Sequence, residues 1–352
     1  MPEIGPKSLA PLLNHFDDLS NAWSASEAQL RSAGLRQQAV NNLLQVRTEI
    51  DLDAEMAKIK QQGAWFLTIA DRQYPDLLRT LPDAPTVLYG RGILTTDDRL
   101  ALSMVGTRKA TAYGREAATD FARQLAGNGI TIVSGLAQGI DSAAHRGALD
   151  GGGRTIAVLG CGIDVMYPRD NRELALEIVQ NGAIITEFPI GTKPIAHNFP
   201  QRNRIIAGLS LGVLVVEAPQ NSGALITAEL ALEYGREVFA VPGNIYNPMG
   251  KGTNLLIQDG AKMVIGVQDI LDELNIAYEH VQTRTVAEML APTTDVEVQL
   301  LEQVGTDPIH VDDLARTCDL PVQIVTSTLT ILELKGLVQS VGQMQYSRKQ
   351  PH

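Results

Sequence analysis

Six short apolar runs recur along the middle of the chain, and each run ends in glycine or polar residues. They are Ala101–Val105, Thr131–Ser134, Thr155–Leu159, Ala183–Thr186, Val213–Glu217 and Val238–Val241. Continuous apolar runs of this length, each followed by a helical segment, are typical of the buried strands of a parallel sheet. We therefore expect an α/β fold built around one open parallel sheet.

The segments that precede these runs show other patterns. Residues 1–50 carry apolar positions at helical spacing and predict a small helical module, which resembles a helix-hairpin-helix or SAM-like module. A small packing domain is the alternative for this segment, because its basic content is low. Residues 51–98 predict an amphipathic helix from Leu52 to Ile59 and two strands, Ala64–Ile69 and Thr86–Tyr89. We expect these two strands to extend the main sheet.

The C-terminal part predicts a winged helix. Three helical segments, Val296–Val304, Val311–Cys318 and Val322–Lys335, precede a short hairpin around Gly342. This order of elements is that of a winged helix-turn-helix. The expected parts are thus a helical module at 1–50, an α/β domain at 51–272, a linker at 273–294 and a winged-helix domain at 295–349.

The charge of the chain is unevenly distributed. The chain has 352 residues and a net charge of −11, but residues 95–265 hold 15 Lys and Arg against 16 Asp and Glu. A near-neutral sheet domain with arginines gathered at one edge can bind a polyanion, because binding depends on the local potential. No signal peptide or bilayer-spanning run is visible, so we expect a cytoplasmic protein.

The two cysteines do not indicate a metal site. Cys161 and Cys318 are far apart in the sequence, and neither has a second cysteine or a histidine at metal-ligand spacing. We expect both to be reduced and buried, and we expect no metal and no cofactor.

Glycines and basic residues follow several of the predicted strands. Gly106-Thr107-Arg108-Lys109 follows the first, and a loop from Gly135 to Gly139 follows the second. Small residues at these positions allow backbone N–H groups to approach an anion at the start of the next helix. Arg169, just before a helix, is a further candidate for phosphate binding.

The strongest signal is Phe199-Pro200-Gln201-Arg202-Asn203-Arg204 at the head of an apolar helix. Arginine presents planar, bidentate donors that suit phosphate, although one of the two arginines is also open to an internal salt bridge. Ser222-Gly223 supplies a hydroxyl and free amides at another helix start. Because the carboxyl ends of parallel strands share one edge, we expect these loops to converge and to bind a chain of phosphates.

Taken in order, these motifs resemble the DNA-processing protein A (DprA, or Smf) family. They are Val105–Arg108, Ser134–His145, Thr155–Gly160 with Tyr167-Pro168, Phe199–Ile206, Ser222–Thr227 and Val241–Gly243. The resemblance implies an extended Rossmann-like fold and a homodimer that binds single-stranded DNA, protects it and loads the recombinase RecA during natural transformation. It also implies that Arg108, Arg169, Arg202 and Arg204 contact phosphates.

The expected nucleic-acid-binding residues are Gly106, Thr107, Arg108, Lys109, Gly135, Gly139, Arg169, Lys193, Phe199, Arg202, Asn203, Arg204, Ser222 and Gly223. Few aromatic residues accompany them, so we expect limited stacking and weak sequence preference.

The sequence leaves two hypotheses for a catalytic function open. The same cleft could serve as the nucleotide pocket of a phosphoribohydrolase-like enzyme with Glu229 as its carboxylate, but the chain lacks the P-G-G-x-G-T arrangement of such enzymes. Asp141 and His145 lie four residues apart on one helical face and could pair, but no nucleophile accompanies them. We expect a binding protein and no enzyme.

The predicted winged domain is acidic. Residues 285–352 contain nine Asp and Glu against four Lys and Arg, and the segment Val322–Leu334 has no basic residue. A helix that reads a DNA groove needs Arg, Lys, Asn or Gln against bases and phosphates. The composition therefore favours a role in protein interaction or packing.

Overall fold

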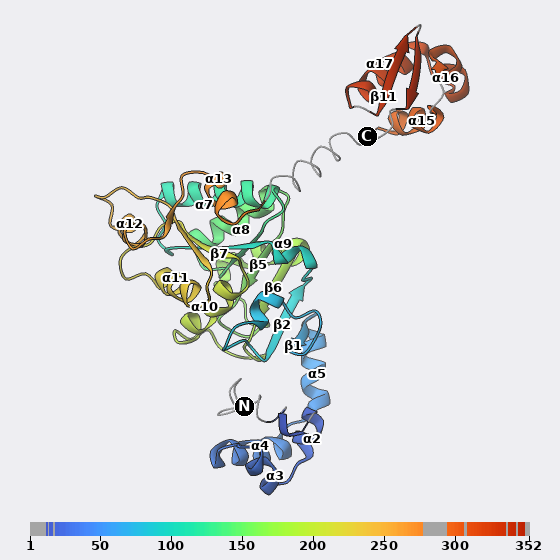
Figure 1. Cartoon of the computed structure of the whole chain (residues 1–352). Helices are drawn as coiled ribbons and strands as arrows, with labels where there is room; N and C mark the ends of the chain where they lie inside the picture. The colour runs from blue at the N-terminus through green and yellow to red at the C-terminus, as the bar shows by residue number, and fades with distance from the viewer. Residues whose placement is uncertain are drawn as a thin grey trace. The chain divides into compact units, whose positions relative to one another are not determined.

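The structure is a computed structural model that describes residues 12, 14–16, 18–276, 294–305, 308–335, 337–342 and 344–348. The chain divides into two compact units, Met1–Ile276 and Ala277–His352 (Figure 1). Most of the predicted linker at 273–294 and residues 1–11 of the predicted helical module lie outside the described residues.

A nine-stranded sheet forms the centre of the first unit. Its order is β1-β2-β6-β5-β4-β3-β7-β8-β9. The strands are β1 (Trp65–Thr68), β2 (Val87–Gly92), β3 (Ala101–Val105), β4 (Thr131–Ser134), β5 (Thr155–Val158), β6 (Gly182–Thr186), β7 (Gly212–Val215), β8 (Glu237–Ala240) and β9 (Lys262–Met263).

The predicted strand runs are confirmed. Strands β3 to β9 pair in parallel, whereas β2 pairs antiparallel with both β1 and β6. The two strands expected from residues 51–98 thus do extend the sheet. The chain proceeds from β3 to β6 on one side and then crosses to β7 on the other, so the strand order reverses beside β3. Ligands of open α/β sheets bind near such a reversal.

Helices cover both faces of the sheet (Figure 1). One face carries α7 (Ala112–Gly127), α8 (Ile140–Asp150), α9 (Arg172–Asn181) and α13 (Val267–Glu273), and the other carries α6 (Asp76–Arg79), α10 (Asn198–Gly208), α11 (Gly223–Glu233) and α12 (Lys251–Gln258). Because side chains alternate along a strand, Leu102 and Met104 of β3 pack against α7 and α8. Ala101 and Val105 pack in the cluster that includes α10 and α11.

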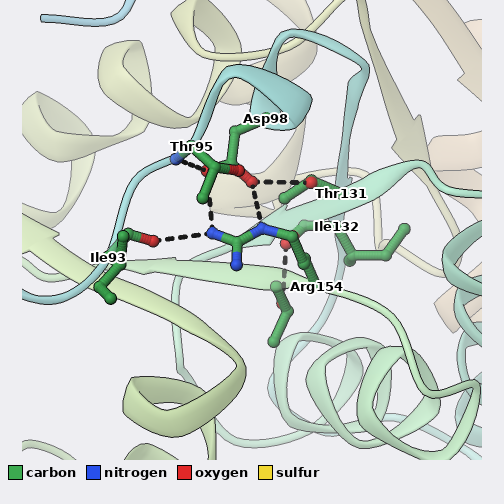
Figure 2. A network of polar contacts seen from close by, with 7 residues as sticks. Ile93, Thr95, Asp98, Thr131, Ile132 and Arg154 are labelled. Carbon is green, nitrogen blue, oxygen red and sulfur yellow. Dashed lines mark hydrogen bonds and ion pairs between the residues drawn. The ribbon is translucent and has the colours of Figure 1, made fainter. Parts of the chain in front are cut away.

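A polar network joins the amino ends of β4 and β5 to the short 3₁₀ helix η1 (Thr96–Arg99) (Figure 2). The Asp98 carboxylate accepts hydrogen bonds from the Arg154 guanidinium at 2.9 and 3.0 Å and from the Thr131 hydroxyl at 2.9 Å. Its Oδ2 also accepts from the backbone N–H of Thr95 at 2.7 Å, and Arg154 donates to the carbonyl of Ile93 at 2.7 Å. The network fixes the edge of the sheet opposite to the glycine-rich loops.

The segment before the sheet is helical. It contains α2 (Leu19–Ser24), α3 (Glu27–Ser32), α4 (Gln37–Glu49) and α5 (Leu52–Gln61). The first three share a small apolar core that includes Leu30, Val40 and Leu43. Arg47 closes this core by donating to the carbonyls of Ala22 and Ala25, both at 2.7 Å.

The second unit has the order predicted for a winged helix. It contains α15 (Asp295–Gln303), β10 (Ile309–His310), α16 (Val311–Cys318), α17 (Val322–Leu334), β11 (Val338–Gly342) and β12 (Gln345–Arg348). The three strands pair in the order β10-β12-β11, and the unit has its own apolar core.

Both cysteines are buried and unpaired, as expected. Across the parts of the chain that the structure describes, we found no helix with the length and apolar character needed to cross a bilayer.

Candidate nucleic-acid interface

A small cavity of about 130 Å³ opens where β3, β4 and β5 end. The loops that follow these three strands form its walls, together with the N-terminal half of α10. The lining residues are Arg108, Gly135, Ala137, Gln138, Leu159, Gly160, Cys161, Tyr167, Pro168, Phe199 and Arg202. Four residues singled out from the sequence, namely Arg108, Gly135, Phe199 and Arg202, therefore meet in one cavity.

Arg202 lies at the base of this cavity and is only 4% exposed. Its guanidinium donates to the carbonyl of Gly135 at 2.8 Å and also to the carbonyl of Val158, at the ends of β4 and β5. Burial lowers the pKa of Arg202 to about 10, and the nearby Asp141 carboxylate favours the charged form. The guanidinium is therefore protonated at neutral pH, and its direct partners are mainly neutral oxygens.

Arg108 is exposed and lies over an aromatic ring. Its guanidinium carbon is 5.1 Å from the centre of the Phe199 ring, a cation–π distance. The Phe199 ring is in turn 5.6 Å from the ring of Tyr167. The cavity thus presents two guanidiniums and two aromatic rings, the groups that suit a nucleotide's phosphate and base.

Two of the predicted glycines are explained by close contacts. A Cβ atom at Gly135 would lie 2.5 Å from the Arg202 guanidinium, so a larger residue would displace that group from its carbonyl partners. Gly139 has a φ of +84° and would place a Cβ 2.3 Å from the carbonyl of Thr107. Gly139 therefore joins the loops that follow β3 and β4.

The chain's own carboxylates already bond one helix start and one of the glycine-rich loops. Glu217 accepts hydrogen bonds from the N–H and the hydroxyl of Thr111, both at 2.8 Å, at the beginning of α7. Asp141 accepts from the N–H groups of Gly135 and Ala137 at 3.2 and 3.3 Å. The amide of Gly135, expected to face a phosphate, is therefore directed to an internal anion.

The remaining predicted residues lie around the cavity or further along the same edge. Lys109, Arg169 and Lys193 are exposed, and Arg169 follows Pro168, which lines the cavity. Asn203 accepts from Arg202 Nε at 3.2 Å and donates to the carbonyl of Gly223 at 3.3 Å.

The other predicted residues lie at the start of α11 and in the loop after β3. The Ser222 hydroxyl caps α11 by accepting from the N–H of Ala224 at 3.3 Å. Gly223 is exposed, with open space where a side chain would be. Gly106 and Thr107 pack against the loop after β7, where Thr107 donates to the carbonyl of Glu217 at 2.7 Å.

Arg204 is placed differently from the sequence expectation. It is 8% exposed and forms an ion pair with Glu187, and its Nε lies 3.6 Å from Asp83 Oδ2. The internal salt bridge considered for one of the two arginines therefore applies to Arg204. Helical spacing explains this, because residues two apart on α10 point in different directions.

Some residues that line the cavity are not among those expected from the sequence. They include Ala137, Gln138 and Leu159, although Ala137 and Gln138 lie between Gly135 and Gly139 in the loop after β4. Burial raises the pKa of the Cys161 thiol to about 11, so this thiol stays protonated at neutral pH. None of the described residues that line the cavity is acidic.

The geometry does not support either of the two enzyme hypotheses. Glu229 is exposed on α11 and does not line the cavity. Asp141 bonds loop amides, whereas His145 bonds the hydroxyl of Thr155 at 2.7 Å, so the two side chains have separate partners.

A doubly wound sheet with a cationic, partly aromatic cavity at its carboxyl edge places the first unit in the class of α/β proteins that bind ligands where the strand order reverses, and the second unit is a winged helix. Residues 65–275 match the family model described as DNA recombination-mediator protein A, and residues 286–343 match the DprA winged helix domain. This chain belongs to the DNA recombination-mediator protein A (DprA/Smf) family.

Individual relatives agree with this assignment. Protein Smf from Synechocystis sp. is 35% identical over 98% of this chain and 96% of its own length. DNA processing protein DprA from Streptococcus pneumoniae is 44% identical over 63% of this chain and 78% of its own length.

Two solved structures share the fold. DNA processing protein A from Streptococcus pneumoniae has a TM-score of 0.68 at 38% identity, over 76% of this chain and 92% of that chain. DNA processing protein A from Helicobacter pylori, described in connection with its single-stranded DNA binding mode, has a TM-score of 0.54 at 33% identity, over 60% of this chain and 97% of that chain.

Proposed function

We propose that this protein binds single-stranded DNA along the carboxyl edge of its main sheet and acts as a recombination mediator. The observation that carries the proposal is the cavity in which Arg108 lies over Phe199 above the buried charge of Arg202. Arg108, Lys109, Arg169 and Lys193 supply the phosphate contacts, and Arg204 has a structural role. The absence of acidic side chains among the described lining residues favours a polyanion.

The size of the cavity favours a single strand over a duplex. A volume of about 130 Å³ accommodates one base or one phosphate group. A stacked duplex cannot insert a base there without unpairing it, which costs a few kcal/mol. A single strand has unstacked bases available and avoids this cost.

We propose binding and not catalysis as the function of this site. Hydrolysis of an N-glycosidic or phosphate ester bond needs a positioned carboxylate, nucleophile or metal. The described residues that line the cavity include no carboxylate, and their one thiol has a raised pKa. Incubation with nucleoside monophosphates should therefore release no free base.

The test is a salt titration of a fluorescently labelled oligo-dT, followed by anisotropy. Each neutralised phosphate lowers the logarithmic salt slope for a single strand by about 0.7. Arg108→Ala should therefore make the slope shallower by about 0.7, and it should cost about 1–3 kcal/mol of binding free energy. Its melting temperature should match that of the parent protein because Arg108 is exposed.

Arg99→Ala is the matched control. Arg99 is also exposed, but it lies at the amino end of β3 in an ion pair with Asp76 at 2.8 Å. The Arg99→Ala variant should bind oligo-dT as tightly as the parent protein does. Equal losses in both variants would show that only total charge matters and would contradict a site at Arg108.

Membership of the DprA/Smf family supports a proposal for the wider role. We propose that the protein acts as a homodimer in natural transformation, protects incoming strands from nucleases and loads RecA onto them. The parent protein should protect a bound oligomer from nuclease digestion and should stimulate RecA-dependent strand exchange. Both effects should be smaller for Arg108→Ala. Light scattering should give the mass of two chains.

A further inference from the structure

The loop after β4, residues 135–139, forms part of the cavity wall, and its backbone adopts an unfavourable conformation. Leu136 has a φ of +55°, in the left-handed region that residues with a side chain rarely adopt. Its side chain is fully buried in the same apolar cluster as Leu159 and Leu174. A backbone conformation of this kind persists only where the surrounding structure holds it in place.

Asn171 holds the carbonyl groups of this loop. Its Nδ2 donates one hydrogen bond to the carbonyl of Leu136 at 2.8 Å and a second to the hydroxyl of Ser142 at 2.9 Å. That hydroxyl donates in turn to the carbonyl of Ala137 at 2.6 Å. One buried amide therefore holds two successive carbonyls of the loop, the first directly and the second through Ser142.

The direction of the Asn171 side chain is not explained by the helix that follows it. Asn171 ends the short 3₁₀ helix η2 (Arg169–Asn171) and is the N-cap residue of α9. Asparagine is preferred at N-caps because its side-chain oxygen can accept from the free N–H groups of the first turn. Within the described residues of α9, Asn171 makes no such bond. Its side chain is therefore used for the loop after β4 and not for its own helix.

The loop that Asn171 holds carries groups of the proposed DNA site. The carbonyl of Gly135 accepts from Arg202 at 2.8 Å. Gln138 lines the cavity and donates to Asp170 in η2 at 2.7 Å. Because η2 also carries Arg169, the hydrogen bonds between the loop and η2 join two parts of the site.

We propose that Asn171 is a positioning residue of the DNA site, which keeps the loop after β4 in the conformation that binds the strand. The inference rests on the proposed function. Asn171 is 6% exposed and does not line the cavity, so it acts through the loop. Without its bond, Leu136 should leave the left-handed region, which is disfavoured about tenfold for a residue with a side chain. Only the remaining fraction of molecules would be ready to bind, so the affinity should fall by the same factor.

The experiment uses Asn171→Ala in the full-length protein, because this change removes both hydrogen bonds and adds no charge. Binding of labelled oligo-dT, measured by anisotropy, should weaken about tenfold. The logarithmic salt slope should remain that of the parent, because the number of neutralised phosphates does not change. Asn171→Ser is the second variant. Its hydroxyl can cap α9 but is too short to reach the carbonyl of Leu136, so it should give the same loss of affinity.

Thr131→Val is the matched control. The Thr131 side chain is also buried, and its hydroxyl donates to Asp98 at the other end of β4. This variant should lower the melting temperature but bind oligo-dT as tightly as the parent does. Hydrogen exchange measured by mass spectrometry should become faster at residues 135–139 in Asn171→Ala and should not change there in Thr131→Val.

The outcomes separate the two proposals. Unchanged affinity in the folded Asn171 variants overturns the positioning role and leaves the proposed function intact. An equal loss of affinity in Thr131→Val overturns it as well, because any loss of stability would then weaken binding. A shallower salt slope in Asn171→Ala would show a direct phosphate contact, and failure of both Asn171 variants to fold would show a role in the whole domain. Either result contradicts positioning. Absence of oligo-dT binding by the parent overturns both proposals.

Discussion

Arg202 and Arg204 lie two residues apart on α10, and their different partners give them different roles. Both are buried, but Arg202 contacts mainly carbonyl oxygens whereas Arg204 contacts carboxylates. A guanidinium among carbonyls keeps its net charge and attracts an anion, whereas a guanidinium among carboxylates is neutralised. Arg202 therefore contributes to the potential of the cavity.

Removal of Arg204 should destabilise the fold. Glu187 would remain buried without its partner, and burial already raises the pKa of this carboxyl group. Arg204→Ala should lower the free energy of unfolding by about 3–5 kcal/mol, measured by urea titration. The double variant Arg204→Met with Glu187→Leu should recover most of this loss and bind oligo-dT normally. Normal stability of Arg204→Ala with weakened DNA binding would contradict the structural role.

His145 is a second buried group whose environment determines its charge. Its Nδ1 bonds the Thr155 hydroxyl at 2.7 Å, and this hydroxyl itself donates to the carbonyl of Ile132. Nδ1 must therefore carry the proton of a neutral ring. Burial lowers the pKa of His145 to about 3, and the charge of Arg202 acts in the same direction.

This depressed pKa predicts a loss of stability in acid. The unfolded chain binds a proton on this ring below about pH 6.5, but the folded chain does not until about pH 3. The free energy of unfolding should therefore decrease by up to about 1.4 kcal/mol per pH unit in this window. His145→Gln should flatten this dependence in urea titrations.

The comparison with His145→Gln is needed because Asp141 and Glu187, whose pKa values burial raises, act in the opposite direction. An identical slope for parent and variant would contradict the assignment of a neutral, buried imidazole.

At the scale of elements, internal carboxylates hold the loops that form the site. Glu217 fixes the start of α7, and Asp141 fixes the loop before α8. Acidic groups are stabilising at helix N-termini. Here they accept hydrogen bonds from buried backbone N–H groups that would otherwise have no acceptor. The chain itself therefore fixes the backbone of the site, and the side chains that project from it are left for contact with a ligand.

The network of Figure 2 fixes the opposite edge of the sheet, and its loss should affect stability alone. Asp98→Ala removes the partner of Arg154 and of Thr131, so the free energy of unfolding should fall by about 2–4 kcal/mol. Affinity for oligo-dT should not change in the folded protein. Asp97→Ala is the matched control, because Asp97 is adjacent and exposed. Equal destabilisation in both variants would contradict the network's role.

At the scale of the whole molecule, negative charge is denser in the second unit than in the first. Residues 277–352 hold ten Asp and Glu against five Lys and Arg, whereas residues 1–276 hold 30 against 24. The winged unit has its own core, and α17, the longest helix among its described residues, carries no lysine or arginine. An acidic surface of this kind repels phosphates and favours a protein partner.

Truncation after Ile276 should therefore leave DNA binding intact. The fragment of residues 1–276 should bind oligo-dT with an affinity within about twofold of the full chain, since all the residues proposed to contact DNA lie in the first unit. Gel shifts with single and double strands measure this. A tenfold loss on truncation would show that the winged unit contributes to the DNA site.

Much of the architecture was predictable from local patterns. The run Ala101–Val105 matches β3 residue for residue, and Val311–Cys318 matches α16, because apolar periodicity reports directly on burial. The convergence of the loops at Gly106, Gly135 and Gly160 was also predictable, because parallel strands end at a common edge. The direction in which each arginine side chain points was not predictable from the sequence.

The sequence by itself determined the class of fold, the winged helix and the edge of the sheet on which the cationic loops meet, because strand and helix periodicities are local properties. Only the tertiary structure decided that Arg202 contacts carbonyls and that Arg204 contacts Glu187. It also decided that Glu217 bonds the start of α7 and that Asp141 bonds the loop before α8. These pairings join residues that are distant in the chain, and their geometry depends on packing between elements that no local pattern records.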